Sequence, residues 1–338
     1  MVITEIRRDA ITGRMVVIDR GPLKRQDDFD LEPARLDDRP AACPFCEGRE
    51  ADAGPEILAW REGGPANVPG WSVRVVPNRN PMLRIEGGME VRSDGMFETR
   101  DGLGAHEVII ETPLHDQPLH ALDADRLWRV LWAWRTRMQD LKRDSRFASI
   151  VVFKNHGRAA GARLDHAHSQ LTAYPVIPPA LAEKVQGGSQ HHEATGHCIF
   201  CDTIAAEAHD GRRIISDRDE MIAYAPFASR VPFETWLMPR DHSPRFEDAD
   251  DKLLERLAGG IRTVMTAIDW ALERPPYNLV LHSAPLAGVV DAAFHWHLAI
   301  LPRVTRYSGQ EWGSGVYRNP VAPEEAAKVL RDRVNAGG

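Results

Sequence analysis

The chain has 338 residues, of which 43% are hydrophobic, and its formal net charge is −7. This length suits two domains with packed cores, and no apolar run is long enough to span a membrane. Scattered basic residues in an acidic chain argue against a general nucleic-acid binder, but they allow single nucleotides as ligands. The opening residues MVITEIRRDA are too polar for a signal peptide, so we expect a cytoplasmic protein.

The four cysteines form two Cys-x-x-Cys pairs, Cys43 with Cys46 and Cys198 with Cys201. Disulfides are uncommon in a cytosolic chain of this size. Each pair instead predicts half of a tetrahedral metal site. A redox function is the alternative interpretation, but neither pair lies in a recognisable thioredoxin-like context.

The segments that follow each cysteine pair come in the same order. A β-rich run closes on a proline and a histidine, His115 in the first copy and His242 in the second. Further along, a strand with an asparagine follows, Asn155 or Asn278, and then a glycine-bearing turn and a strand that holds His-x-His. This repeated order predicts two copies of one unit.

Between the histidine and the asparagine strand, each copy predicts a long amphipathic helix. Asp123 and Asp248 are the predicted N-caps, and the acidic residues after them suit the positive end of a helix. The apolar residues that we expect in the core are Leu127, Val130, Leu131, Trp134, Met138 and Leu141 in the first copy, and Leu253, Leu254, Leu257, Ile261, Val264, Met265 and Ile268 in the second.

We therefore predict an α+β fold with an N-terminal catalytic domain at residues 1–180 and a C-terminal domain at 181–338. The first copy carries an insertion at 87–104, a glycine-rich segment typical of a hairpin. Residues 176–196 are rich in proline, glycine and polar residues and predict a mobile linker. Its histidines, His191 and His192, and the adjacent His197 are assigned to that linker rather than to a metal or a catalytic site.

Each copy supplies two cysteines and two histidines at matching places, which are the ligands that zinc prefers. The predicted first set is Cys43, Cys46, His115 and His166, and the predicted second set is Cys198, Cys201, His242 and His295. A closed set of four protein ligands indicates a structural site without an open position for water. We predict two structural zinc sites, with iron as an alternative metal in the second.

The stretch LDHAHSQLTA places His166, His168 and Gln170 on one face of a strand. Solvated strand residues and core histidines are the two plain interpretations. If a metal holds His166, however, His168 becomes a fixed imidazole beside an amide, which is an arrangement typical of a nucleophile with an oxyanion helper. Gly157 and Gly161 in the turn before it would let backbone N–H groups approach a phosphate.

The pattern of NHG, AG, HAHSQ, CPFC, VRVVPNRNP and ETPLH resembles the galactose-1-phosphate uridylyltransferase family of the histidine-triad superfamily, over nearly the whole chain. Gln170 stands where the triad hydrolases carry a third histidine, and a glutamine there is typical of the transferase branch. The resemblance implies two half-barrel domains of an antiparallel sheet plus a helix, related by a pseudo-twofold axis, and a homodimer. Neither a nucleic acid nor a membrane is expected as a partner.

The resemblance also implies roles for individual residues. It makes His168 the nucleophile that becomes nucleotidylated and Gln170 the contact to the phosphoryl group. Substrate-binding roles fall on Asn78, Asn155, Arg20, Arg25 and Glu311, although the segment between the two arginines is one residue longer than in the family. In the second copy Ala299 replaces the glutamine, so we expect that half to be a structural partner and His297 not to be a second nucleophile.

The implied reaction is ping-pong transfer of a nucleotide from a nucleotide-sugar to hexose 1-phosphate, with uridylyl transfer between UDP-glucose and galactose 1-phosphate as the leading hypothesis. HAHSQ, the second Cys-x-x-Cys pair and GSGVYRNPVAPEEAAKV resemble the plant-type branch, which implies an ADP-glucose phosphorylase with phosphate as acceptor as the alternative. A third hypothesis is a non-catalytic, zinc-dependent nucleotide-binding protein. The motifs do not separate uracil from adenine.

Overall fold

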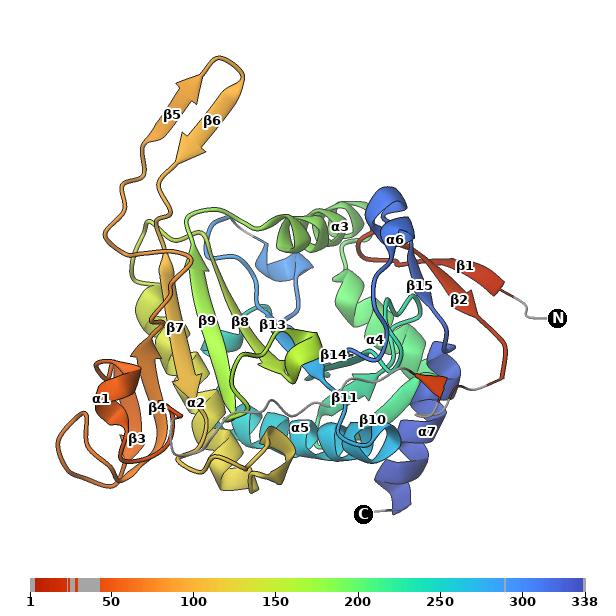
Figure 1. Ribbon diagram of the computed structural model, residues 1–338. Helices are drawn as coiled ribbons and strands as arrows, with labels where there is room; N and C mark the ends of the chain where they lie inside the picture. The colour runs from red at the N-terminus through yellow and green to blue at the C-terminus, as the bar shows by residue number, and fades with distance from the viewer. Residues whose placement is uncertain (1–3, 23, 25–27, 30–42, 289, 337–338) are drawn as a thin grey trace.

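The computed structural model describes residues 4–22, 24, 28–29, 43–288 and 290–336 (Figure 1). The first part of the chain forms β1 (Thr4–Arg8), β2 (Met15–Asp19), α1 (Glu50–Ala53), β3 (Leu58–Arg61), β4 (Trp71–Pro77), β5 (Val91–Asp94), β6 (Phe97–Arg100), β7 (Ala105–Ile110), α2 (Ala124–Leu141), β8 (Ser149–His156) and β9 (His168–Tyr174). The second part forms α3 (Pro179–Thr195), α4 (Ile199–Asp210), β10 (Ile214–Arg218), β11 (Met221–Tyr224), β12 (Thr235–Pro239), α5 (Asp251–Leu272), β13 (Tyr277–His282), β14 (His297–Pro302), α6 (Gly309–Ser314), β15 (Tyr317–Asn319) and α7 (Pro323–Ala336).

The main sheet shows the internal duplication directly. Its ten strands run in the order β10-β11-β12-β14-β13-β8-β9-β7-β4-β3, and the pairs given are antiparallel. Five strands from each copy follow the same sequence outward from the central pair, β8 with β13. The α+β class and the predicted repeat are therefore confirmed, although the two half-barrels join edge to edge into one sheet. The domain boundary at residue 180 stays a prediction.

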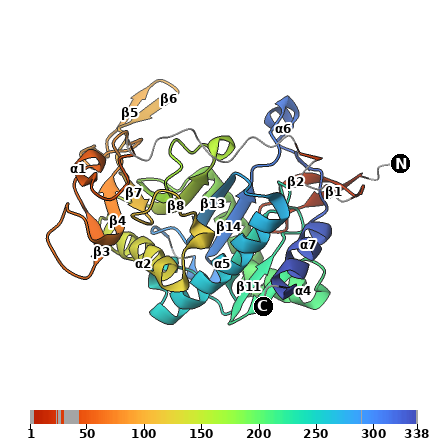
Figure 2. The same ribbon diagram turned by 60° about the horizontal axis from the view of Figure 1, so that its bottom comes forward.

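One face of this sheet is covered by α2 and α5, which pack against each other (Figure 2). The predicted apolar stripes of both helices are buried there, apart from the half-buried Leu253. Alternation along the strands sends Leu171 and Ala173 of β9 to this core, and Gln170 to the opposite face. The opposite face is therefore where the polar residues of the repeated motif lie.

Of the two predicted N-caps, the one of α2 is confirmed and the one of α5 is not. Asp123 caps α2, because its carboxylate accepts a hydrogen bond from the backbone N–H of Arg126. Asp250, and not Asp248, caps α5, since its carboxylate accepts from Leu253 N–H. Asp248 ends the 3-10 turn Phe246–Asp248 that precedes the helix, so the prediction for it was wrong by two residues.

The segment predicted as a mobile linker is the helix α3. Gly187 and Gly188 are the reason that it packs so closely: a Cβ at Gly187 would lie 1.7 Å from the carbonyl oxygen of Ile11, and a Cβ at Gly188 would lie 2.4 Å from that of Ala293. The two glycines thus allow close backbone approach rather than mobility. α3 and α4 cover the second half of the face that lies opposite α2 and α5.

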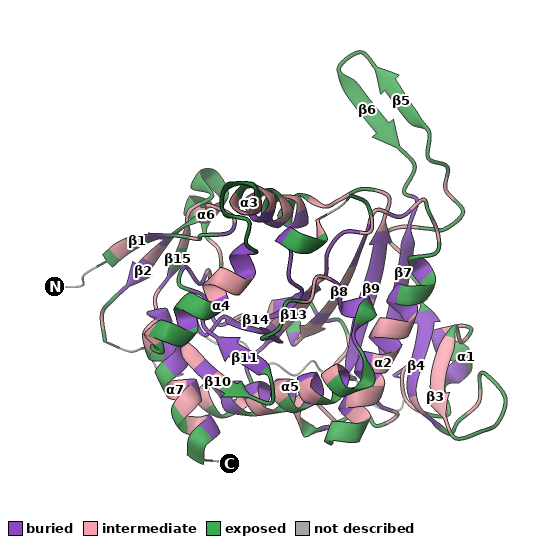
Figure 3. Ribbon diagram, turned by 180° about the vertical axis from the view of Figure 1, so that it is seen from behind, coloured by how far each residue is buried: buried purple, intermediate pink, exposed green. Residues whose placement is uncertain are grey.

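The predicted insertion is the hairpin of β5 and β6, and it projects from the body of the molecule (Figure 3). Every residue of these two strands is exposed. The equivalent connection in the second copy, between β11 and β12, contains no strand among its described residues. The difference between the copies at this point is therefore confirmed.

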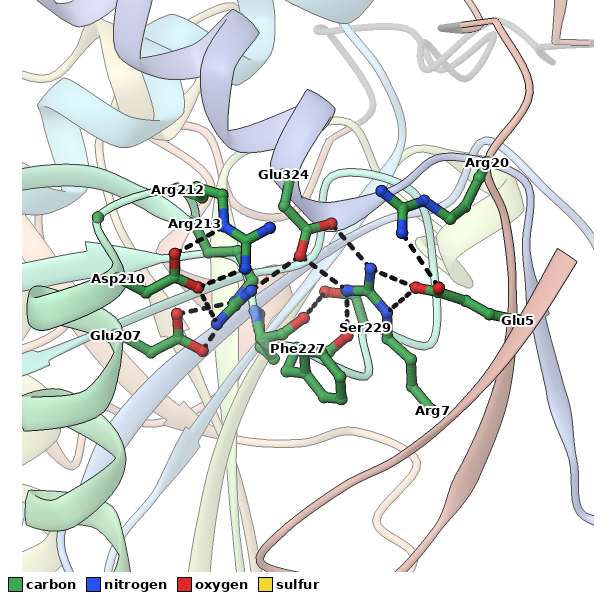
Figure 4. Close-up of polar contacts among 12 residues, drawn as sticks. Glu5, Arg7, Arg20, Glu207, Asp210, Arg212, Arg213, Phe227, Ser229 and Glu324 are labelled. Carbon is green, nitrogen blue, oxygen red and sulfur yellow. Dashed lines mark hydrogen bonds and ion pairs between the residues drawn. The ribbon is translucent and has the colours of Figure 1, made fainter. Parts of the chain in front are cut away.

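A separate three-stranded sheet joins the two ends of the chain, since β2 pairs with β1 on one side and with β15 on the other. Ion pairs fasten this sheet to the second half (Figure 4). Arg7 binds both carboxylate oxygens of Glu324 in α7, at 2.9 and 3.0 Å, and Arg213 binds the same carboxylate at 2.8 Å. Within the described residues, no helix has the length and apolar character needed to cross a bilayer.

Candidate active site and metal centres

The first cysteine pair meets two histidines at the end of β7 and the start of β9. Potential ligand atoms of Cys43, Cys46, His115 and His166 all lie within 4.8 Å of one another. Nδ1 of His166 lies 3.6 Å from both sulfurs, and Nδ1 of His115 lies 3.4 Å from Cys46 Sγ. Because His166 Nε2 lies 2.7 Å from the carbonyl oxygen of Thr112, Nε2 carries the proton and Nδ1 is left as the ligand atom.

The second group, at the start of α4, brings three of its four predicted ligands together. Cys198, Cys201 and His242 have ligand atoms within 4.8 Å of one another, and His295 is not part of that mutual set. Nδ1 of His242 lies 3.3 Å and Nδ1 of His295 lies 3.6 Å from Cys201 Sγ. His242 Nε2 lies 2.8 Å from the carbonyl oxygen of Asp291, which again leaves Nδ1 as the ligand atom.

Both groups fit a tetrahedral metal. Bond lengths of about 2.3 Å to sulfur and about 2.05 Å to nitrogen place these atoms roughly 3.6 Å apart around one ion. Burial raises the pKa of Cys43 to about 11, whereas a hydrogen bond from the Cys201 thiol lowers the pKa of Cys198 to about 6. A cation would favour the thiolate in both groups.

His168 follows the first metal group by two residues and is the first residue of β9. The residue is 8% exposed, and its ring meets Phe45 edge-on, with 5.2 Å between the ring centroids. Nδ1 lies 2.8 Å from the carbonyl oxygen of His166, so Nδ1 carries the proton. Nε2 has no hydrogen-bond partner in the described part of the chain. Burial, followed by the charge of Lys154, lowers the pKa of His168 to about 4, so the ring is neutral at pH 7.

The backbone beneath His168 is supported by a buried ion pair that the sequence motifs did not reveal. Lys154 Nζ lies 2.7 Å from Glu111 Oε2 and donates to the carbonyl oxygen of His168 at 3.0 Å. Both side chains are almost fully buried. A lysine in the apolar run SIVVFKNHG is the signal that could have indicated a buried partner, since a lone buried charge is costly.

Gln170, two residues beyond His168, lies at the centre of a small hydrogen-bond network. Its Oε1 lies 2.8 Å from His106 Nε2 and 3.2 Å from Asn78 Nδ2. Asn78 had been predicted near the nucleotide, whereas His106 was missed. Only the register of β7 against β9, which places Val108 opposite Gln170, brings His106 to the same face.

Asn155 lies on β8, beside β9, and faces its duplicate. Its Oδ1 accepts a hydrogen bond of 2.8 Å from Asn278 Nδ2, and Asn278 also donates to the carbonyl oxygen of Ala160. Gly157 and Gly161 have φ angles of 78° and 88°, in the region that glycine adopts without strain. The turn between β8 and β9 therefore has the backbone freedom that a phosphate-binding loop needs.

Comparison with known proteins places this constellation in a family. The family model "Galactose-1-phosphate uridyl transferase, N-terminal domain" matches residues 80–178. The ADP-glucose phosphorylase of Arabidopsis thaliana is 35% identical over 334 residues, which cover 97% of this chain and 92% of that protein. The chain belongs to the galactose-1-phosphate uridylyltransferase family.

More distant relatives and solved structures agree with this membership. The galactose-1-phosphate uridylyltransferase of Thermotoga maritima is 24% identical over 337 residues, covering 97% of this chain and 98% of that protein. The crystal structure of the Arabidopsis thaliana ADP-glucose phosphorylase with bound ADP-glucose superposes with a TM-score of 0.81 at 33% identity, covering 98% of each chain. The fold is thus that of the galactose-1-phosphate uridylyltransferase family, and the chain is an enzyme of the nucleotidyltransferase class.

The second copy of this family fold encloses its histidine. His297 is fully buried, and its Nε2 lies 2.5 Å from Nζ of Lys184, which reaches it from α3. The ring stacks on Trp236 at 4.4 Å and on His282 at 4.8 Å between centroids. Lys184 was missed, because a lysine in a polar, glycine-containing segment is typical of a surface.

Two residues with predicted substrate roles, Arg20 and Glu311, lie away from His168 within one chain. Arg20 follows β2 and pairs with Glu5 at 3.2 Å (Figure 4). Glu311 lies in α6, where its carboxylate closes a capping box with Ser308. Figures 1 and 2 both place α6 and β2 on the side of the second half, away from β7. Arg25 lies outside the described residues.

Proposed function

We propose that this enzyme transfers a nucleotide from a nucleotide-sugar through a covalent nucleotidyl-His168 intermediate. In the first step Nε2 of His168 attacks the α-phosphorus, the bond to hexose 1-phosphate breaks, and hexose 1-phosphate leaves with the electron pair. In the second step an acceptor phosphate oxygen attacks the same phosphorus and releases Nε2. Splitting one displacement into two easier ones is the purpose of such a nucleophile.

The observation that carries this proposal is the state of the His168 ring. Its Nδ1–H is held by a carbonyl oxygen, its Nε2 is left with a lone pair, and its lowered pKa keeps it neutral. Gln170 supports the proposal from two residues along the same strand face, as an uncharged donor for a phosphoryl oxygen. A non-catalytic nucleotide-binding protein would not need a nucleophile in this state.

Uridylyl transfer between UDP-glucose and galactose 1-phosphate is the first candidate reaction, and the relatives named galactose-1-phosphate uridylyltransferase support it. A specific observation favours a second candidate, the phosphorolysis of ADP-glucose. The relative named ADP-glucose phosphorylase is 35% identical to this chain, whereas the uridylyltransferase from Thermotoga maritima is 24% identical. The two reactions share the chemistry at His168 and differ in base and acceptor.

One experiment tests the proposal and separates the two reactions. The protein is incubated without acceptor, with UDP-glucose or with ADP-glucose, and its intact mass is measured. A uridylyl adduct supports the first reaction and an adenylyl adduct the second. If neither donor leaves a nucleotide on the protein, covalent transfer is excluded for both.

We also propose zinc as the metal of both Cys/His groups, with iron as the alternative in the second. The mixed sulfur and nitrogen donor sets suit both metals. Metal analysis of the protein purified without added metal ions would distinguish zinc from iron. Loss of the ions on treatment with a chelator should destabilise the fold, because binding and folding are coupled.

A homodimer completes the proposal. Arg20 and Glu311 carry predicted substrate roles but lie away from His168, and a second copy could present them to it. Trp312, beside Glu311, is 80% exposed, which suits a contact surface. Light scattering tests the dimer, and mixing His168→Ala chains with Glu311→Ala chains tests sharing, because mixed dimers would contain one intact site. A cytoplasmic location is proposed as well, and cell fractionation would test it.

A further inference from the structure

Two donors converge on one atom of Gln170. His106 Nε2 lies 2.8 Å and Asn78 Nδ2 lies 3.2 Å from Gln170 Oε1. Whether these groups truly donate depends on the tautomer of His106 and on the orientation of the Asn78 amide. Backbone N–H groups, which can only donate, determine both.

The tautomer of His106 follows from Met82. The backbone N–H of Met82 donates to His106 Nδ1 at 3.1 Å, so Nδ1 must hold a lone pair and Nε2 must carry the proton of the neutral ring. Burial lowers the pKa of His106, which favours that neutral ring. His106 therefore donates from Nε2 to the amide oxygen of Gln170.

The orientation of Asn78 follows from Asn80. The backbone N–H of Asn80 donates to Asn78 Oδ1 at 2.9 Å, which turns Nδ2 of Asn78 toward Gln170. The 3.1 Å contact between Asn78 Nδ2 and His106 Nε2 then joins two donors around one acceptor and is not itself a hydrogen bond. Both donors require that the shared atom of Gln170 is its oxygen.

With its oxygen held by two donors, Gln170 has its NH2 group left for another partner. No hydrogen bond from Gln170 Nε2 is found within the described chain. Gln170 and His168 lie on the same strand face, two residues apart, so that NH2 group is available to an oxygen of a phosphoryl group bound to His168. A rotated amide would present its carbonyl oxygen there instead, and two acceptors would repel each other.

We propose that His106 is a positioning residue for nucleotidyl transfer: the backbone N–H of Met82 sets its tautomer, and its Nε2–H fixes the Gln170 amide with the NH2 group toward the transferred phosphoryl group. This role rests on the proposed function, and it adds a residue on β7 to a site otherwise described by the histidines and glutamine of β9. It acts through Gln170 and touches no reacting atom.

A double-mutant cycle tests the proposal. The rate of nucleotidyl-His168 formation is measured in single turnovers in the wild-type enzyme, His106→Phe, Gln170→Ala and the double variant, with kcat and KM for the nucleotide-sugar. We expect His106→Phe to lower the rate by about tenfold or more with a smaller change in KM, because the amide contact develops with the transition state. In the Gln170→Ala background the same change should have no further effect.

Two more variants separate positioning from folding. His106→Gln restores an N–H donor at similar reach and should recover part of the rate. His120→Phe is the matched control, since it makes the same chemical change at a half-buried histidine that instead faces Asp269. Its rate should stay near that of the wild type, and thermal melting checks that every variant is folded.

The outcomes separate the two levels of the argument. Equal rate losses from His106→Phe with and without Gln170 would overturn the positioning role while leaving the covalent mechanism intact. A wild-type enzyme that forms no adduct with UDP-glucose or ADP-glucose would overturn the proposed function and the positioning role together. A rate loss from His106→Phe that is seen with Gln170 present and disappears in the Gln170→Ala background supports both the covalent mechanism and the positioning role.

Discussion

The two halves of the sheet share one backbone arrangement, but their equivalent histidines have different surroundings. His168 and His297 are the first residues of equivalent strands, and each Nδ1 lies against the carbonyl oxygen two residues earlier, at 2.8 and 3.0 Å. Nε2 of His168 has no partner among the described residues, whereas Nε2 of His297 meets Lys184. The backbone frame around the proposed nucleophile is thus present in both halves, and the surroundings of the two rings differ.

Three features distinguish the surroundings of His297 in the second half from those of His168. Ala299 takes the place of Gln170, Trp236 and His282 stack on the ring of His297, and α3 brings Lys184 over it. In the first half the same face carries Gln170, Asn155 and the turn with Gly157 and Gly161. The comparison teaches that a duplicated frame can diverge when a helix covers the histidine of one copy.

The largest expected difference between the two halves is the effect of replacing His168 or His297. His168→Ala should abolish the nucleotide adduct and lower turnover by at least about a thousandfold, because a nucleophile is lost outright. His297→Ala should keep the adduct but lose roughly 2–4 kcal/mol of unfolding free energy, since a buried ring leaves a cavity. Intact mass and urea denaturation measure the two effects. An adduct on His168→Ala would contradict the assignment of the nucleophile.

The second effect concerns the metals. His166→Ala and His295→Ala should each lose one metal ion per chain and lower the melting temperature, because a ligand is missing from a closed site. Only His166→Ala should also stop adduct formation, since His166 holds the strand of the nucleophile. His209→Ala, at an exposed histidine of α4, is the control and should leave the metal content unchanged. Equal loss of adduct in both ligand variants would remove the distinction between the halves.

The third effect concerns the glutamine that the second half lacks. Gln170→His introduces a group that can exchange protons with water, so the nucleotidyl intermediate should hydrolyse about tenfold faster or more. The measurement is the decay of labelled intermediate after donor is removed. Unchanged decay would reject the idea that an uncharged amide protects the intermediate.

The smallest effect concerns stability alone. Burial lowers the pKa of Lys184 well below its ordinary value, so the folded chain releases a proton that the unfolded chain still binds up to about pH 10.4. The unfolded state therefore binds more protons in this window, and the unfolding free energy contributed by Lys184 falls as pH falls through it.

Lys184→Met should remove that dependence and keep the packing. As pH rises toward about 10, the unfolding free energy of the wild type should rise more steeply than that of the variant, by about 1 kcal/mol per pH unit. Denaturation by urea at several pH values measures both slopes, and the wild type at constant pH is the reference. Parallel slopes would show that Lys184 is charged in the folded chain.

The sequence predicted the features that chemistry marks by residue type and spacing. The cysteine pairs, the recurring histidines and the strands with Asn155 and Asn278 could be aligned with each other, so the duplication and the two metal groups were foreseen. The hairpin at 87–104 was foreseen as well, because its glycines mark turns.

The features that were missed depend on contacts between distant segments. Gly187 and Gly188 look like a flexible linker in sequence, but they mark a helix that packs against backbone. The contact of His106 with Gln170 depends on the register of β7 against β9. The contact of Lys184 with His297 depends on the place of α3 above β14. Local patterns cannot supply such information, because the same residues on an open surface would be equally acceptable.

The sheet formed by β1, β2 and β15 has a consequence for synthesis. A chain leaves the ribosome with its amino end first, so the strands Thr4–Arg8 and Met15–Asp19 emerge long before Tyr317–Asn319, the parallel neighbour of β2, exists. The anchor that Glu324 gives to Arg7 comes later still. Until Tyr317–Asn319 has been synthesised, this edge of β2 stays open to chaperones and to pairing with other nascent chains.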